Sequence, residues 1–105
     1  MRAAFASIDG SRIDQHFGNA RWWQIYDVGK DGGVFVETRK SRAKYAGHCE
    51  DGFNHLLKLL SDCDAVFVGK IGETAAAFMI QNGMRVFEAA GEVAGIIEEV
   101  KNGAF

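Results

Sequence analysis

The segment D-C-D-A-V-F-V-G-K-I-G, Asp62 to Gly72, decides the fold of this chain. Its centre, Ala65 to Val68, is a continuous apolar run that ends at a glycine, which is typical of a strand buried on both faces of a sheet. The Ala-rich segment Glu73 to Asn82 comes next and is predicted to be a helix that stops at Gly83. A strand that leads directly into a helix indicates a parallel crossover connection.

The same alternation extends on both sides of this unit. Before it, apolar residues at helical spacing predict an amphipathic helix over Asp51 to Ser61. After it, Arg85 to Phe87 is a short strand candidate. Apolar residues then return at helical spacing from Val93 to Val100, and Gly103 ends this last helix.

The first third of the chain has the rhythm of strands. Ala3 to Ile8 and Trp22 to Val28 are apolar or aromatic, and Lys30 to Gly33 has the composition of a hairpin turn before a returning strand, Val34 to Thr38. The expected element order is therefore βββαβαβα. We predict an α/β fold, a three-layer α/β/α arrangement around a mixed five-stranded sheet, with residues 1–105 forming a single domain.

Composition excludes several functional classes. The chain has 105 residues, 48% of them hydrophobic and 25% charged, as in ordinary globular domains. A net charge of −2 gives no electrostatic case for nucleic acid or a membrane surface. No apolar run approaches the roughly 20 residues of a membrane span, and the first ten residues turn polar too early for a signal peptide. We expect a cytoplasmic protein, in which Cys49 and Cys63 stay reduced.

His16 is the first candidate for a functional side chain. It lies in the segment I-D-Q-H-F-G-N-A, Ile13 to Ala20, in a loop that follows the first predicted strand. Loops at strand ends commonly carry function, and imidazole is both a metal ligand and a proton carrier. The same local pattern also fits a surface histidine that is hydrogen-bonded to its own loop. In either case Gly18 would let the backbone turn away from His16.

A basic segment supplies the second group of candidates. Four cations lie within six positions and precede a histidine and a cysteine: Arg39, Lys40, Arg42, Lys44, His48 and Cys49. A loop with cations, an imidazole and a thiol suits an anionic metal species. The alternative is a solvated basic loop with an incidental thiol.

Two further features have a more limited interpretation. The turn Gly69 to Gly72 joins a strand to a helix and could offer backbone N–H groups to an anion, although it lacks the spacing of a nucleotide-binding loop. Cys63 continues the apolar stripe of the preceding helix and is predicted to be a small core residue.

Taken together, these motifs resemble the dinitrogenase iron-molybdenum cofactor biosynthesis family, the group of NifX, NifY, the NafY core and the NifB C-terminal domain. The resemblance covers nearly the whole chain. It rests on S-x-D-G-x-x-I-D-Q-H-F-G from Ser7 to Gly18, the aromatic strand W-W-Q-I-Y-D-V, the segment Asp62 to Gly72, and N-G-M-R-V-F-E-A from Asn82 to Ala89.

The resemblance implies a ribonuclease-H-like fold and non-catalytic binding of iron-molybdenum cofactor or an iron–sulfur precursor during nitrogenase assembly. The family's H-F-G histidine corresponds to His16, the expected metal ligand, with Phe17 and Gly18 as its setting. Apart from the resemblance, the charge and chemistry of nearby side chains suit an anionic cluster, and on this ground the expected cofactor-binding residues beyond the H-F-G motif are Arg12, Arg42, Lys44, His48 and Cys49. The implied partners are the cluster and cofactor-assembly proteins or nitrogenase. We expect a monomer or weak homodimer.

Three hypotheses remain open from the sequence. The leading one is a carrier of iron-molybdenum cofactor, or of another metal cluster outside nitrogen fixation, with His16 as ligand. The second is a small enzyme in which His16 acts as a general base near Asp14, although no partner nucleophile is evident. The third is a protein-interaction module that uses exposed aromatic residues of Trp22–Trp23, one of which should point outward by strand alternation.

Overall fold

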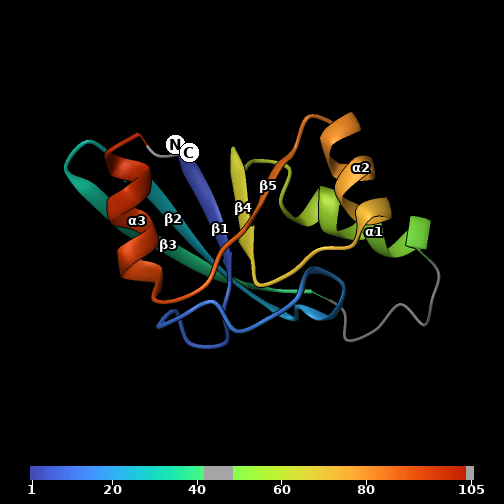
Figure 1. The fold of residues 1–105 in the computed structure, drawn as a ribbon, viewed down its shortest axis with the longest axis horizontal. Coiled ribbons are helices and arrows are strands. Elements are labelled where there is room, and N and C mark those ends of the chain that lie inside the picture. The colour runs from blue at the N-terminus through green and yellow to red at the C-terminus, as the bar shows by residue number, and fades with distance from the viewer. Residues whose placement is uncertain (42–48, 104–105) are drawn as a thin grey trace.

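The computed structural model describes residues 1–41 and 49–103. Figure 1 shows the strands side by side in one sheet, with helices on both of its faces. The elements in chain order are β1 (Arg2–Ala6), the short 3-10 helix η1 (Phe17–Asn19), β2 (Trp22–Gly29), β3 (Gly32–Lys40), α1 (Cys49–Leu59), β4 (Ala65–Val68), α2 (Glu73–Gln81), β5 (Arg85–Glu88) and α3 (Val93–Lys101).

The five strands lie in the order β3-β2-β1-β4-β5. β1 is central: it pairs antiparallel with β2 and parallel with β4. β2 and β3 form an antiparallel hairpin, and β5 runs parallel to β4 at the other edge. The predicted mixed five-stranded, ribonuclease-H-like sheet is confirmed, because α1 and α2 lead the chain to β4 and β5, and both of these strands run parallel to β1.

Helices cover both faces of the sheet, so the predicted three-layer arrangement is also confirmed. α1 and α2 lie on one face and α3 on the other (Figure 1). The four residues of β4 are all buried, with Val66 and Val68 in the core under α1 and α2. Ala65 and Phe67 belong to the core under α3. A strand buried on both faces explains the continuous apolar run that the sequence shows there.

β3 is longer than predicted and changes the interpretation of two cations. The strand extends over Gly32–Lys40, so Arg39 and Lys40 pair with Trp23 and Trp22 in the β2–β3 ladder. Our prediction that these cations belong to a basic loop is therefore wrong. Lys40 Nζ lies 5.2 Å from the centroid of the half-exposed Trp22 ring, whereas Trp23 is buried, as alternation predicted.

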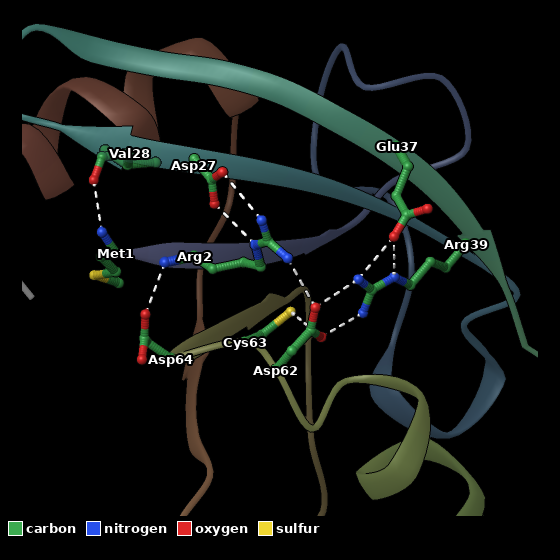
Figure 2. A network of polar contacts seen from close by, with 9 residues as sticks. All are labelled: Met1, Arg2, Asp27, Val28, Glu37, Arg39, Asp62, Cys63 and Asp64. Atoms are coloured by element: carbon green, nitrogen blue, oxygen red, sulfur yellow. Dashed lines mark hydrogen bonds and ion pairs between the residues drawn. The ribbon is translucent and has the colours of Figure 1, made fainter.

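Arg39 is held in an ion-pair network that ties distant segments together (Figure 2). The Asp62 carboxylate lies between two guanidinium groups, accepting two bonds from Arg39 (2.6 and 2.8 Å) and one from Arg2 (2.9 Å). Arg39 also donates to the Leu59 carbonyl at the end of α1 (2.8 Å). These bonds lower the pKa of Asp62 below its usual range, chiefly through Arg39. The network therefore connects β1, β3 and the end of α1.

Other boundaries differ by two residues. β1 ends at Ala6 because Ser7 and Ile8 turn into the next loop, where the Ser7 hydroxyl accepts a bond from the Gly10 N–H (2.9 Å).

Cys63 is 7% exposed, which confirms it as a core residue, and burial raises the pKa of its thiol to about 12. Within the described residues, none of the helices has the length and apolar character needed to cross a membrane.

Candidate functional site

The loops that follow β1 and β4 meet at the carboxyl ends of these two neighbouring parallel strands. An open pocket of about 370 Å³ lies there. Its lining consists of the His16 loop, the turn after β4 and the first turn of α2: His16, Phe17, Gly18, Lys70, Ile71, Gly72, Glu73, Thr74 and Ala75. The carboxyl edge is where α/β sheets generally bind ligands, since the loops there can be built for binding without disturbing the sheet.

The His16 loop is anchored at its two ends by apolar side chains. Ile13 is buried in the core under α3, whereas Phe17 is buried in the core under α1 and α2. The Phe17 ring meets Trp23 edge-on, with ring centroids 6.2 Å apart. The residues between the two anchors must cross the carboxyl edge of the sheet, and His16 is exposed there. The loop is thus built to present its histidine.

Two polar side chains close the loop around His16. The Asp14 carboxylate accepts a bond from the Ile8 N–H (3.1 Å) and so fixes the first half of the loop. The Gln15 amide fixes the second half, because it donates to the Trp22 carbonyl (2.7 Å) and accepts from the Arg21 N–H (3.0 Å). Asp14 and Gln15 therefore stabilise the loop that presents His16, and the bond described for Asp14 goes to the Ile8 backbone.

Backbone bonds on each side of His16 clamp the loop onto the turn after β4. The Gly69 N–H donates to the Gln15 carbonyl (2.8 Å), and the Phe17 N–H donates to the Lys70 carbonyl (2.8 Å). A Cβ atom at Gly69 would lie 3.2 Å from the Gln15 carbonyl oxygen and 3.4 Å from His16 Cδ2. A side chain at position 69 would therefore crowd the Gln15 carbonyl and touch the imidazole, and the absence of one lets the His16 loop lie close to the turn.

The prediction that the turn Gly69–Gly72 offers its N–H groups to an anion is only partly met. The Gly69 N–H is already used by Gln15. Gly72 is the N-cap of α2 and has no side chain that could cap the first turn, whose residues Glu73, Thr74 and Ala75 line the pocket. The amino end of a helix carries partial positive charge, so this wall of the pocket favours a negative group, although Glu73 opposes it.

The predicted site residues are distributed unevenly. The structure brings His16, Phe17 and Gly18 together at the pocket. Arg12 is not among the lining residues and pairs through its backbone with Glu92, before α3. Arg42, Lys44 and His48 lie outside the described residues. Cys49 is the first residue of α1, and its backbone alone is described.

The backbone conformation at Gly18 differs from the one expected. Its φ is not positive, and a Cβ atom there would meet nothing within 4 Å. The backbone therefore does not require glycine at this position, and our expectation that Gly18 lets the chain turn away from His16 is wrong. The residue lies in η1, a single 3-10 turn that most amino acids adopt.

Sequence reasoning considered the turn Gly69–Gly72 only for its backbone N–H groups, and missed both the Lys70 side chain and the contact of Gly69 with the His16 loop. Lys70 brings a cation to the lining of the pocket that holds His16. A signal was present, because Gly69 and Lys70 follow a buried strand, but nothing local indicates that this turn meets a loop more than fifty positions earlier. Among the described residues, no three histidine, cysteine or acidic side chains come close enough to hold a metal ion together.

Comparison with known proteins adds an independent line of argument. A family model described as dinitrogenase iron-molybdenum cofactor matches residues 1–103. The protein NifX of Rhodobacter capsulatus is 34% identical over 108 residues, which cover 96% of this chain and 68% of that protein. The protein NifY of Klebsiella pneumoniae is 34% identical over 89 residues, or 85% of this chain but only 38% of NifY.

A solved structure supports the fold. The crystal structure of PH0822 matches with a TM-score of 0.76 and covers 98% of this chain and 91% of that one. The sequence identity is 21%, so this likeness concerns the fold alone. The loop after β1 and the turn after β4 therefore belong to a scaffold that recurs in a distant chain.

Proposed function

The chain belongs to the dinitrogenase iron-molybdenum cofactor family, and from this premise we propose that it is a non-catalytic carrier of iron-molybdenum cofactor or of an iron–sulfur precursor. Its similarity to NifX and NifY supports a role in the biosynthesis of this cofactor. In the proposed role the cluster is cargo, which is received from one assembly protein and passed to another or to nitrogenase.

The observation that carries the proposal is the presentation of His16. The imidazole is exposed at the lining of the pocket. On its two sides the Gln15 carbonyl accepts a bond from Gly69 and the Phe17 N–H donates one to Lys70, which fixes the backbone. A side chain that is held by its neighbours but open to solvent is arranged to meet something from outside. Neutral imidazole is a common ligand of iron and other transition metals, and one such ligand permits release.

The charge around His16 fits an anionic, sulfide-rich cargo. Lys70 shares the pocket, and the amino end of α2 forms part of its wall. We further propose that Arg42 and Lys44 contribute, with His48 and Cys49 as auxiliary contacts. Support comes from Ser41, which precedes this segment: its N–H donates to the Arg21 carbonyl (2.8 Å), and its hydroxyl donates to the Ala20 carbonyl. Ala20 and Arg21 follow η1 on the same loop as His16.

Anaerobic titration with isolated iron-molybdenum cofactor tests the proposal. Wild-type protein should bind the cofactor, and His16→Ala should weaken binding by at least about tenfold, which corresponds to about 1.4 kcal/mol. His55→Ala is the matched control, because it removes an imidazole from α1, outside the pocket lining. Equal affinity of His16→Ala and wild type for the cofactor would contradict the role of His16 as a ligand.

The identity of the cluster is resolved by a second titration. A synthetic [4Fe–4S] cluster, which lacks molybdenum, should bind more weakly if iron-molybdenum cofactor is the cargo. Tighter binding of the simpler cluster would instead favour a family member that carries iron–sulfur precursors. Sedimentation of the free and loaded protein would also test our expectation of a monomer or weak homodimer.

A further inference from the structure

Glu88 lies beside the end of β4, where the chain leaves the sheet and forms one wall of the pocket. It is the last residue of β5 and is paired in register with Val68, the last residue of β4. The Ala89 N–H donates to the Val68 carbonyl (2.8 Å), which extends this pairing by one step. The side chain of Glu88 is therefore carried by a fixed strand end next to the turn Gly69–Gly72.

The carboxylate of Glu88 reaches into that turn. Its Oε2 atom accepts a hydrogen bond from the Ile71 N–H (2.9 Å). Ile71 lines the pocket and directly follows Gly69 and Lys70, the two residues whose backbone groups clamp the His16 loop. One carboxylate thus fixes the middle of a short turn, and the first half of the same turn holds His16 in place.

We propose that Glu88 is a positioning residue for His16, acting through the turn after β4 although 72 positions separate the two residues. No other partner for the Ile71 N–H is described within residues 1–41 and 49–103. Loss of the carboxylate would leave a turn without a regular hydrogen-bond ladder free to shift, and the Gly69 and Phe17 bonds would loosen with it. The consequence for cargo rests on the proposed function, whereas the consequence for the loop does not.

The geometry requires an oxygen acceptor at Glu88 and does not require its negative charge. Glu88→Gln keeps a carbonyl oxygen within reach of the Ile71 N–H, whereas Glu88→Ala removes the acceptor. This pair of variants separates the effect of the acceptor oxygen from the effect of the negative charge. A negative charge near an anionic cargo should oppose binding, so its removal alone should not weaken binding. Glu99→Ala, an exposed position on α3, is the matched control for the loss of one carboxylate.

Two measurements test the proposal. By NMR, amide hydrogen exchange at Gly69 and Phe17 should be about fivefold faster in Glu88→Ala, which is the effect of losing one ordinary hydrogen bond, and unchanged in Glu99→Ala. Affinity for isolated iron-molybdenum cofactor should fall by about five- to tenfold in Glu88→Ala. Glu88→Gln should restore both quantities to within about twofold of wild type.

Each alternative outcome has a distinct meaning. Unchanged exchange at Gly69 and Phe17 in Glu88→Ala overturns the proposal, whatever the cargo does. Equal defects in Glu88→Gln and Glu88→Ala also overturn it, because the acceptor oxygen that glutamine keeps would then not be what holds the turn. If wild-type protein does not bind the cofactor, the proposed function fails, and the exchange measurement alone decides the role of Glu88.

Discussion

The contact between Gly69 and the His16 loop leads to a sharp prediction for Gly69→Ala. A methyl group at this position would lie 3.2 Å from the Gln15 carbonyl oxygen and 3.4 Å from His16 Cδ2. The oxygen is part of the backbone and accepts the Gly69 N–H bond, so it cannot swing aside as a flexible side chain would. The loop must therefore move away from the turn by a few tenths of an ångström.

The expected magnitude follows from two opposing effects. Inserting a methyl group into a close contact typically costs about 1–3 kcal/mol. Replacing glycine by alanine where φ is not positive recovers about 0.4–1 kcal/mol, because the unfolded chain has fewer conformations. We expect the free energy of unfolding to fall by about 1 kcal/mol on balance. This loss of stability is concentrated in the contacts that hold His16, so affinity for isolated iron-molybdenum cofactor should drop by about fivefold.

Urea unfolding and anaerobic cofactor titration measure the two quantities on the same preparation. Gly95→Ala is the control: Gly95 lies inside α3, and a Cβ atom there would meet nothing within 4 Å. This variant should gain about 0.5–1 kcal/mol of stability and bind the cofactor as wild type does. If Gly69→Ala behaved in the same way, more stable and with unchanged affinity, the reasoning that joins this turn to the presentation of His16 would be refuted.

Three other residues give shorter predictions. Lys70→Gln should weaken cofactor binding by about three- to tenfold and reduce its sensitivity to salt, which titrations at two salt concentrations would measure; Lys70→Arg should retain binding, and equal salt sensitivity in Lys70→Gln would contradict the role. Asp62, whose folded pKa is depressed, contributes stability above the unfolded value of about 4 that is lost as the pH falls toward the folded pKa. Urea unfolding between pH 3 and pH 7 should therefore show a shallower acid loss in Asp62→Asn, and an unaltered slope would exclude this contribution. Cys63, with its pKa raised by burial to about 12, should resist alkylation at pH 8 until the protein is unfolded, as peptide mapping can show; rapid labelling of the native thiol would contradict its burial.

The fold was predictable because its elements have clear local patterns. The apolar run at β4 and the helical spacing around it identify a parallel unit, and the chain order leaves few arrangements of the sheet. Boundaries were less predictable. β3 was predicted two residues short at each end, because Gly32 and Gly33 have the composition of a turn and the charged pair Arg39 and Lys40 resembles a loop in sequence.

The site was predictable only in part. His16 could be identified from its motif. The turn that contains Gly69 and Lys70 was also noticed, but the relation of this turn and of Glu88 to His16 exists only once β1, β4 and β5 lie side by side. Arg39 and Lys40 were assigned wrongly for a related reason. Counting charges along the chain grouped Arg39 with a basic loop, whereas in the structure it is bound to Asp62 and 14% of its side chain is exposed.

The clamp around His16 also bears on how a carrier could release its cargo. A structural metal site built from several thiolates and imidazoles binds with about 10–16 kcal/mol, which would make transfer to another protein slow. In the described part of this chain, the pocket lining contributes one imidazole and one ammonium group to an anionic cluster. A single ligand of this kind, with charges that are screened by solvent, suits a dissociation constant near the micromolar range, which is a binding free energy of about 8 kcal/mol. Rigidity at Gly69 and Glu88 would then keep the ordering cost of the loop low, so that weak contacts suffice to hold the cargo and a receiving protein with more ligands can remove it.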